Sequence, residues 1–347
     1  MQQYHDLVEK VLRSGNYRKN RTDADTLSTF SQFYRIDLQE GFPLLKTKDL
    51  SGYRWNSLIH ELLWYFSGEH HIRNLREETK IWDAWADEDW NLPTAYGRFW
   101  RRYPVPQESA RLEGEQWPDR DTRWVSEEDG NLVVDQLRYV IDTLRGENPN
   151  RSPYSRRLVV TPWHPANAEV SDLPPCHAMF VMNVQDGKLN THLTQRSGDI
   201  GLGIPFNIAA YSLITKIIAK QTDFEVGEFA HTIVDAHIYC GKGGRGLWYD
   251  KNISELGERV SRCEDRSDYL EVRDWILENA PDEDGASPED DEYGYDHVPG
   301  LLKQLSRESR PRPSMKVAEK PIDDLEYDDF DLEDYNPHPG IKFSVAE

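Results

Sequence analysis

Apolar residues recur at every third or fourth position in three stretches of the chain. This spacing places them on one side of a helix, so it predicts helices over residues 4–12, 55–66 and 207–222. The apolar positions that carry the prediction are Tyr4, Leu7, Val8, Val11 and Leu12; Trp55, Leu58, Ile59, Leu62, Leu63 and Phe66; and Ile208, Tyr211, Leu213, Ile214, Ile217 and Ile218. Glu61 lies on the flank of the second helix, where a carboxylate is either an ordinary surface group or a functional one.

The middle of the chain is predicted to form a sheet. Residues 158–160 and 179–184 are short apolar runs, and residues 189–196 and 229–239 alternate between polar and apolar side chains. The polar residues that share a face are Asn190, His192, Thr194 and Arg196 in the first alternation, and His231, Asp235, His237 and Tyr239 in the second. Strands and helices do not alternate regularly, so we expect an α+β fold with one large mixed sheet packed by helices.

Two polar segments interrupt this pattern and are predicted to be surface insertions. The first covers residues 104–130 and is rich in acids. The second covers residues 241–299 and contains, at 281–292, the sequence PDEDGASPEDDE with almost no apolar residue. Such a run of charge is typical of a solvated loop.

The charge of the chain bears on its partners and its habitat. Of 347 residues, 62 are Asp or Glu and 41 are Lys or Arg, so the formal net charge is −21. Binding to nucleic acid depends on clustered Lys and Arg, so we expect no nucleic-acid partner. An acidic protein repels itself at low salt, and molar salt shortens the Debye length to about 3 Å. We infer a salt-rich cytoplasm such as a halophile's; an acidic protein of ordinary habitat is the alternative.

The composition also limits the class of protein. Hydrophobic residues make up 37% of the chain and include 11 Trp, 17 Tyr and 11 Phe, which is enough for a core and excludes a wholly disordered chain. No apolar run approaches the roughly 18 residues of a membrane span. The first ten residues are polar and lack the apolar segment of a signal peptide. Cys176, Cys240 and Cys263 are scattered and form no CxxC pair, so we expect a cytoplasmic protein without disulfides or a metal.

Cys176 is the first candidate for chemistry. It follows Leu173-Pro174-Pro175 and precedes His177, beside a predicted strand. A single cysteine there is either a small core residue or a nucleophile, and a nucleophile needs nearby positive charge to lower the pKa of its thiol. Glycine-rich loops of the Rossmann or P-loop kind are absent from the sequence, so NAD(P) is not expected.

Several polar residues could bind a nucleotide. Arg196 and Ser197, at a predicted strand end, offer a charge-assisted hydrogen bond and a hydroxyl to a phosphate. Arg156 and Arg157 are a second anion site or an ordinary surface pair. Asn207, at the predicted start of a helix, is either its N-cap or a reader of a base edge, because an amide offers a donor and an acceptor together.

Several short motifs then lead to one family. They are Ile81-Trp82-Asp83, Pro175-Cys176-His177, Gln195-Arg196-Ser197-Gly198-Asp199, Gly203-Ile204-Pro205-Phe206-Asn207, Asp235-Ala236-His237-Ile238-Tyr239 and His338-Pro339-Gly340-Ile341-Lys342. In these motifs and their order the chain resembles the thymidylate synthases, of the folate-dependent kind with a cysteine nucleophile. Its acidity and Tyr53-Arg54-Trp55-Asn56 resemble versions from halophilic archaea. The resemblance implies a single catalytic domain over residues 1–347, interrupted by the insertions at 104–130 and 241–299.

The resemblance implies a reaction as well. Cys176 would add to C6 of the uracil of dUMP, which makes C5 a nucleophile toward the methylene of 5,10-methylenetetrahydrofolate. The folate would also supply the hydride and leave as dihydrofolate, so no metal and no NAD(P) is required. Glu61 would organise water and shuttle protons, while Tyr96 and His177 would assist removal of the C5 proton.

The phosphate of dUMP would be held from two subunits. The resemblance assigns Arg21, Arg196 and Ser197 of one subunit to this phosphate. It assigns Arg156 and Arg157 to the phosphate of the partner subunit, so a homodimer formed through the sheet is implied. These arginines would also favour the thiolate of the nucleophile.

Further contacts follow from the same resemblance. Asn207 would pair with N3 and O4 of uracil and take part in catalysis with Arg196, and His237 and Tyr239 would bind the ribose hydroxyl. Asp199 would lie at both ligands. The residues implied for the folate site alone are Lys48, Ile81, Trp82, Leu173, Gly203, Phe206 and Ala346.

The chain also departs from the family pattern. Residues 22–26 read Thr-Asp-Ala-Asp-Thr where the family usually has Thr-Gly-Thr-Gly-Thr. The two acids, Asp23 and Asp25, would weaken phosphate binding unless they point outward or meet cations. Asp49 stands where a basic residue is usual, and Glu347 ends the chain where an apolar residue is common.

Two alternatives remain at this point. A dUMP hydroxymethylase on the same fold would end the reaction with water rather than hydride; Asn207 argues against dCMP as its substrate, and Trp82 favours reduction. A non-catalytic acidic interaction protein would have no need of Cys176, Arg196, Asn207 and Glu61 together.

Overall fold

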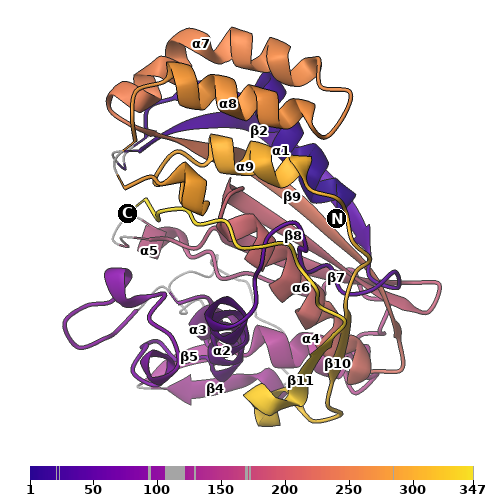
Figure 1. The fold of residues 1–347 in the computed structure, drawn as a ribbon. Helices are drawn as coiled ribbons and strands as arrows, with labels where there is room; N and C mark the ends of the chain where they lie inside the picture. Colours follow the sequence, from indigo (N-terminus) through magenta and orange to yellow (C-terminus); the bar gives the residue numbers. More distant parts are fainter. Residues whose placement is uncertain are drawn as a thin grey trace.

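A six-stranded mixed sheet forms the centre of the molecule (Figure 1). The structure is a computed structural model, and it describes residues 1–20, 22, 24–92, 95–105, 122–128, 130–168, 171, 173–283 and 285–346. Arg21, Asp23, Glu347 and most of the first predicted insertion therefore lie outside the described residues.

The order of the strands confirms the α+β prediction. It is β1 (Asn16–Arg18), β2 (Ala24–Asp37), β9 (Glu225–Lys242), β8 (Lys188–Asp199), β7 (His177–Gln185) and β6 (Val159–Val160). β8 and β9 run parallel and the other neighbouring pairs run antiparallel. The strands predicted at 158–160, 179–184, 189–196 and 229–239 all lie in this sheet.

One face of the sheet is covered by α6 (Gly203–Lys220), which packs on β8 and β9. This helix is apolar on nearly all sides, as expected for one enclosed by sheet and helices. Its start corrects one prediction: the helix begins at Gly203, so Asn207 lies inside it and is not its N-cap. Pro205 fits within the first turn, where a backbone N–H has no helical partner to lose.

The other predicted helices are confirmed, and they frame the sheet. α1 (Gln2–Ser14) packs on β2 with Tyr4 and Val11 fully buried. α2 (Tyr53–Ser67) packs against α3 (Tyr96–Arg101) and α6. A membrane-spanning helix is not found within the described part of the chain.

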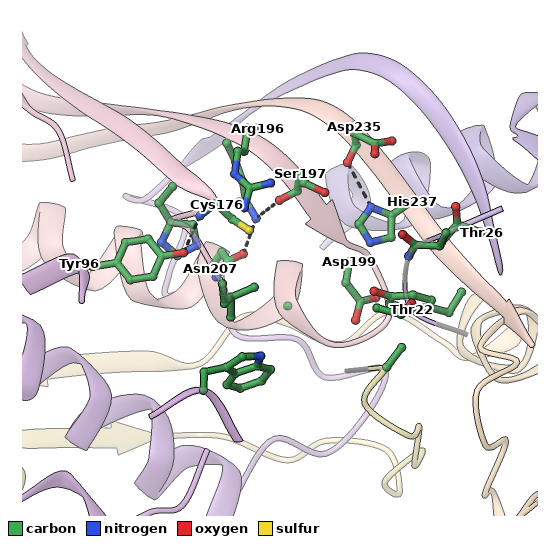
Figure 2. Close-up of a pocket in the computed structure, with 18 of the residues that line it drawn as sticks. Thr22, Thr26, Tyr96, Cys176, Arg196, Ser197, Asp199, Asn207, Asp235 and His237 are labelled. Carbon is green, nitrogen blue, oxygen red and sulfur yellow. Dashed lines mark hydrogen bonds between the residues drawn. The ribbon is translucent and has the colours of Figure 1, made fainter. Parts of the chain in front are cut away.

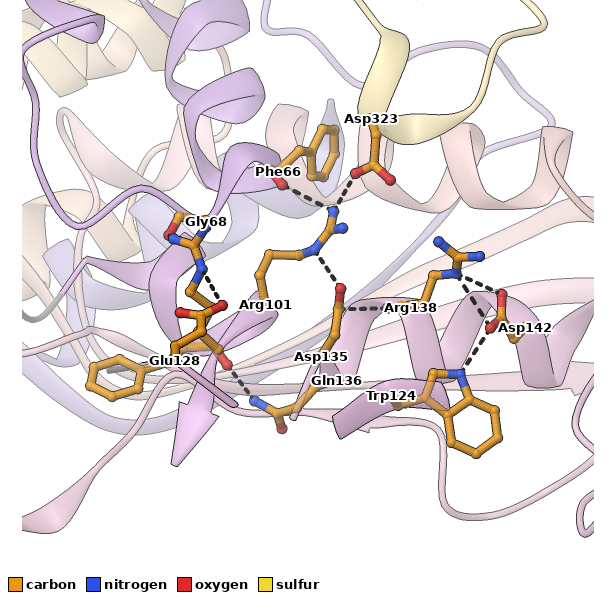
Figure 3. A network of polar contacts seen from close by, with 12 residues as sticks. Phe66, Gly68, Arg101, Trp124, Glu128, Asp135, Gln136, Arg138, Asp142 and Asp323 are labelled. Carbon is orange, nitrogen blue, oxygen red and sulfur yellow. Dashed lines mark hydrogen bonds and ion pairs between the residues drawn. The ribbon is translucent and has the colours of Figure 1, made fainter. Parts of the chain in front are cut away.

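Arg101 joins α3 to α2 and to the segments that contain Asp135 and Asp323 (Figure 3). Its Nε donates to Oδ2 of Asp135 over 2.8 Å, and its Nη1 donates to the carbonyl of Phe66 over 3.0 Å and to Asp323 over 2.5 Å. Asp135 in turn caps α4 (Gln136–Leu144) by accepting from the backbone N–H of Arg138. These bonds hold α2 and α3 together, and the two helices carry Glu61 and Tyr96.

The opposite face of the sheet carries exposed apolar side chains. Phe33 of β2 is 59% exposed, Met179 of β7 is 39% exposed and Val234 of β9 is 38% exposed. In the register of the strands, Phe33 pairs with Thr232 and Met179 pairs with Thr194, so these residues share the face turned away from α6.

Residues 241–299 contain more structure than a surface loop. They form α7 (Gly244–Ser261), α8 (Asp268–Asn279) and the start of α9 (Val298–Ser306), which lie together at one end of the molecule (Figure 1). Tyr249, Leu256 and Ile276 of this segment are fully buried. The acidic run at 281–292, described apart from residue 284, contains a short 3₁₀ helix, Pro288–Asp290, enclosed by a β-bridge between Ser287 and Glu292. That the segment is an insertion in the family pattern stays a prediction.

The remaining strands form two small sheets. β3 (Tyr103–Pro104), β5 (Asn131–Val134) and β4 (Val125–Glu128) make one of them, on either side of the undescribed part of 104–130. β10 (Ser314–Val317) and β11 (Phe330–Glu333) make the other. A short helix, α5 (Pro165–Ala168), precedes β7.

Candidate active site

A cavity of about 400 Å³ opens where the ends of β8 and β9 meet α2, α3 and α6. Most of the predicted site residues line it, although they come from separate parts of the sequence. They are Glu61, Trp82, Tyr96, Leu173, Cys176, His177, Arg196, Ser197, Asp199, Gly203, Asn207, His237, Tyr239 and Ala346. Figure 2 shows the labelled side chains of Cys176, Arg196, Asn207 and His237 around this cavity.

Some predicted residues are placed elsewhere. Arg156 and Arg157 are exposed and do not line the cavity of their own chain. Ile81 and Phe206 are half-buried and also do not line it. Lys48 is buried, with only 2% of its surface exposed, and points to a backbone carbonyl rather than into the cavity.

The cavity also has lining residues to which the sequence had assigned no role. They are Arg18, Lys19, Asn20, Thr22, Thr26, Tyr65, Trp85, Gln195 and Asp235. The signal for Arg18 and Lys19 was present, because they are cations close in sequence to the phosphate-binding Arg21 implied by the resemblance. The register places Arg18 opposite Thr26 in the β1–β2 pair, which brings both to the same end of the cavity.

Cys176 is fixed by its backbone on two sides. Its N–H donates to the hydroxyl of Tyr96 over 2.7 Å, and its carbonyl accepts from the N–H of Arg196 over 2.9 Å. The guanidinium of Arg196 donates from Nε to the carbonyl of Pro175 over 3.0 Å and from Nη2 to the carbonyl of Pro174 over 2.6 Å. A guanidinium has five N–H donors, so donors are left for a ligand in the cavity beside the sulfur.

Asn207 is oriented by a buried chain of hydrogen bonds. Nε2 of Gln195 donates to Oδ1 of Asn207 over 3.0 Å and to the carbonyl of Ser197 over 2.9 Å. Oε1 of Gln195 therefore faces Nε2 of His231 at 2.9 Å, so this histidine nitrogen carries the proton. Nδ1 of His231 then accepts from the hydroxyl of Tyr34 at 2.7 Å. Burial lowers the pKa of His231 well below its usual value, which keeps the ring neutral and this direction fixed.

Glu61 is placed for proton transfer. Its carboxylate lines the cavity and accepts a hydrogen bond from Nε1 of Trp82 over 2.7 Å. Burial raises the pKa of Glu61 to about 7, against the opposing effect of the Trp82 hydrogen bond. A carboxyl group with a pKa near neutrality can both give and take a proton at physiological pH.

The two other predicted proton-handling residues are neutral near pH 7. Burial lowers the pKa of His177 to about 4 and raises the pKa of Tyr96 well above its usual value. Their rings lie 4.7 Å apart between centroids. Neutral groups of this kind can hold water or a substrate carbonyl by hydrogen bonds, and they leave Glu61 as the group that titrates near neutrality.

The lining of the cavity includes cationic side chains. Arg18 forms an ion pair with Asp235 at 3.2 Å, and Ser28 hydrogen-bonds the same carboxylate. Lys19 and Arg196 are the further cations that line the cavity. Because Arg18 is already paired with Asp235, Lys19 and Arg196 are the lining cations best placed to bind an anionic ligand.

The C-terminal segment reaches the cavity at Ala346. Phe343 stacks on His297 with ring centroids 4.4 Å apart, and Nε2 of His297 contacts the carbonyl of Ser344 at 3.1 Å. Nζ of Lys48 lies 5.3 Å from the Phe343 ring and donates to the carbonyl of Gly201 over 2.5 Å. Burial lowers the pKa of Lys48 to about 7. In this arrangement Lys48 packs against the C-terminal segment at Phe343.

Metal ligation is not indicated by geometry in the described ranges, since no group of three His, Cys, Asp or Glu side chains there could hold an ion. The cavity walls instead combine aromatic and apolar side chains, among them Trp82, Trp85 and Leu173, with the polar groups described above. A flat, polar-edged molecule beside an anionic one would match these walls.

Comparison with known proteins agrees with this chemistry. The sequence model of the thymidylate synthase family matches residues 2–347. A curated protein of Haloferax volcanii named thymidylate synthase is 60% identical over 342 residues, which cover 99% of this chain and 96% of that protein. The halophilic character inferred from the acidic composition fits this relative.

Proposed function

The chain belongs to the thymidylate synthase family, and from this membership we propose how its own residues convert dUMP into dTMP. The activity is a methyl transfer to C5 of the uracil. 5,10-Methylenetetrahydrofolate is the family's co-substrate, which supplies both the carbon and the hydride when bound.

Cys176 is the nucleophile that adds to C6 of the uracil. Its backbone is held on both sides, by Tyr96 and by the N–H of Arg196, so the point from which its side chain extends is fixed at the cavity wall. Arg196 also grips the carbonyls of Pro174 and Pro175, and its remaining donors can bind the nucleotide phosphate. Fixing the ring against the sulfur in this way can supply roughly 7–11 kcal/mol of a barrier.

Glu61 moves protons between the ring and water. Its pKa of about 7 lets it serve as acid and as base within one turnover. The neutral Tyr96 and His177 form hydrogen bonds to water in the cavity and so assist removal of the proton from C5 of the uracil.

Asn207 selects uracil. Its Oδ1 is engaged by Gln195, so its Nδ2 group is the one turned to the ligand as donor for O4. N3–H of uracil would donate to Oδ1 of the same amide. The amide also offers a hydrogen bond to the negative charge that develops on O4 after attack at C6. Cytosine has a donor at the first position and an acceptor at the second, so it is disfavoured.

The folate binds beside the uracil against aromatic and apolar walls. Trp82, Leu173, Gly203, Ala346 and Asp199 line the cavity, and Asp199 would contact both ligands. Ile81, Phe206 and Lys48 would then act from behind the wall, with Lys48 supporting the C-terminal segment rather than meeting the glutamate tail.

The phosphate site is completed by a second subunit. Arg156 and Arg157 are exposed and away from their own cavity, as expected of residues donated to a partner. The exposed apolar side chains Phe33, Met179 and Val234 offer the sheet face through which a homodimer would form. In the partner's site the two arginines join Arg18, Lys19, Arg21, Arg196 and Ser197, while His237 and Tyr239 bind the ribose.

The observation that carries the proposal is the placement of Cys176, Arg196, Asn207 and Glu61 in one cavity. The test incubates the full chain with dUMP and 5,10-methylenetetrahydrofolate in molar KCl. Dihydrofolate is followed by its absorbance and the pyrimidine by mass. A 5-methyl product with dihydrofolate is expected. A 5-hydroxymethyl product with tetrahydrofolate would overturn the assignment in favour of a hydroxymethylase.

A further inference from the structure

We propose that the Tyr17 hydroxyl and the first turn of α7 hold the Asp25 carboxylate away from the phosphate end of the cavity, so that Tyr17 and Gly246 act as positioning residues. The proposal rests on the proposed function, because it concerns how the dUMP phosphate is held. It concerns one of the two acids, Asp25, that stand where the family usually has glycine. It also assigns a task to the helical segment that follows β9.

The carboxylate of Asp25 is held away from the cavity. Oδ2 of Asp25 accepts a hydrogen bond from the hydroxyl of Tyr17 over 2.6 Å. Thr22 and Thr26, on either side of Asp25 in sequence, line the cavity, whereas Asp25 does not. The register of β2 against β9 shifts between Ala24 and Thr26, so the direction of Asp25 follows from its contacts and not from strand alternation. Those contacts turn the acid away from the cavity that the two threonines line.

The other side of Asp25 is closed by α7. A Cβ placed on Gly246 would lie 2.4 Å from Oδ2 of Asp25 and 3.0 Å from its Cβ. Gly246 is buried in the first turn of the helix, and no side chain larger than hydrogen fits between helix and carboxylate. The carboxylate is thus enclosed between the Tyr17 hydroxyl and the backbone of α7.

The first turn of α7 cannot move away to relieve this contact. Arg245, next to Gly246, is 5% exposed, and its Nε donates to Oδ2 of Asp296 over 2.6 Å. Its Nη1 donates to the carbonyl of Pro281 over 2.8 Å, and the hydroxyl of Tyr249 donates to the same Asp296 carboxylate over 2.8 Å. Breaking a buried pair of this kind leaves an uncompensated charge, so the turn is firmly anchored.

The physical consequence concerns the bound phosphate. An unrestrained carboxylate at residue 25 would lie near a dianionic phosphate and repel it, since like charges at short range disfavour each other. The Tyr17 hydroxyl and the α7 backbone hold this charge away from the cavity. The chain can therefore carry an acidic residue close to its phosphate site and still bind the phosphate of dUMP.

The test compares two glycines of the same turn. Gly246→Ala drives a methyl group into Asp25, whereas Gly244→Ala is the matched control, because the nearest atom to its added Cβ is 3.9 Å away. The dissociation constant of dUMP and the inhibition constant of inorganic phosphate are measured for both full-length variants in molar KCl. Gly246→Ala is expected to raise both constants about tenfold, because the displaced carboxylate repels the phosphate. Gly244→Ala should leave both constants within about twofold of the wild-type values.

A rescue experiment separates positioning from general damage to α7. Asp25→Gly removes the group that the new methyl meets, so the double variant Gly246→Ala with Asp25→Gly should bind dUMP within about threefold of Asp25→Gly alone. Turnover at saturating dUMP should stay near the wild-type value in every variant. Equal binding by the two alanine variants, or a double variant as weak as Gly246→Ala, would overturn the proposal.

Tyr17→Phe provides a second route should Gly246→Ala fail to fold. It removes only the hydroxyl that holds Asp25, and it should weaken binding of dUMP and of phosphate by the same factor. Unchanged phosphate inhibition in Tyr17→Phe would contradict the proposal. Failure of the proposed function would appear separately, as absence of dTMP formation by the wild-type chain.

Discussion

Gln195 and Asn207 are joined by a single hydrogen bond, 3.0 Å long, from Nε2 of the first to Oδ1 of the second. Gln195 has no freedom to reverse its own amide, because its Oε1 accepts from His231. The orientation of Asn207 is thus set by Gln195 and, through it, by the buried His231. The choice between uracil and cytosine depends on which end of this amide faces the base.

Replacement of Gln195 by glutamate should weaken that choice. In Gln195→Glu the introduced carboxylate still accepts from His231, but it cannot donate to Asn207 and attracts the Nδ2 group of that residue instead. The amide then turns its oxygen to the base. We expect the ratio of kcat/KM for dUMP over dCMP to fall by about tenfold or more, the scale of one misplaced hydrogen bond. Steady-state kinetics with both nucleotides measures it, and an unchanged ratio would exclude control by Gln195.

A direct change of the base reader should act in the same direction. Asn207→Asp places a carboxyl group at the base edge. In its protonated form this carboxyl donates to N3 of cytosine and accepts from the exocyclic amine. Preference should therefore shift from dUMP toward dCMP. Competition between the two nucleotides for binding checks the shift, and retained discrimination against dCMP would argue that another residue reads the base.

The titration of Glu61 predicts a pH-dependent cost to stability. Its usual pKa is 4.5 and burial raises it to about 7 in the folded chain. Between these values the folded state binds more protons than the unfolded state, so the free energy of unfolding falls as pH rises through this window. Glu61→Gln removes the ionisation. The melting temperature of the variant relative to wild type should increase from pH 5 to pH 8 at fixed KCl.

The comparison with wild type isolates this one group, since other titrations are common to both proteins. A constant difference in melting temperature over that range would mean that Glu61 does not titrate there. Activity gives an independent check, because Glu61→Gln should also lose the proton transfer that the carboxyl provides.

The sequence was most informative where function depends on motifs. Cys176, Arg196 and Asn207 belong to short motifs from which the reaction was predicted, and the structure brings them to one cavity. Their supports were not predictable. The partner of Gln195 is His231, 36 positions away in the chain, and only the parallel pairing of β8 with β9 brings them together.

Local sequence predicted less well the elements whose burial depends on distant partners. The folate contact of Lys48, which the resemblance implied, stays a prediction, and contacts to Gly201 and Phe343 bury this side chain. The acidic composition of 241–299 conceals α7 and α8, whose few apolar residues are spaced for one side of each helix. The start of α6 was placed four residues late, because Gly203 and Pro205 are poor helix formers except in a first turn.

The net charge of −21 predicts that stability depends on salt. Raising KCl from about 0.1 M to about 1 M shortens the Debye length from about 10 Å to about 3 Å and screens the repulsion between surface acids. The melting temperature should rise with KCl over this range. Thermal unfolding followed by circular dichroism measures it, and a melting temperature independent of KCl would refute adaptation to salt.

Mixing of two inactive variants tests the nucleophile and the shared phosphate site together. Cys176→Ser should bind dUMP without turnover, because the hydroxyl is a far weaker nucleophile than a thiolate. A second variant, Arg156→Ala with Arg157→Ala, should lack the cations that each subunit donates to its partner. When the two are unfolded, mixed in equal amounts and refolded, about half of the dimers contain one subunit of each kind.

In such a mixed dimer the two defects fall on one site and leave the other intact. The intact site uses Cys176 of the arginine variant and the arginines of the cysteine variant. Since about half of the dimers are mixed and each has one intact site, about a quarter of wild-type activity should return. If each subunit used its own arginines, both sites of every mixed dimer would stay defective and no activity would return. Refolding of each variant alone is the control, and turnover by Cys176→Ser alone would remove this sulfur from the reaction.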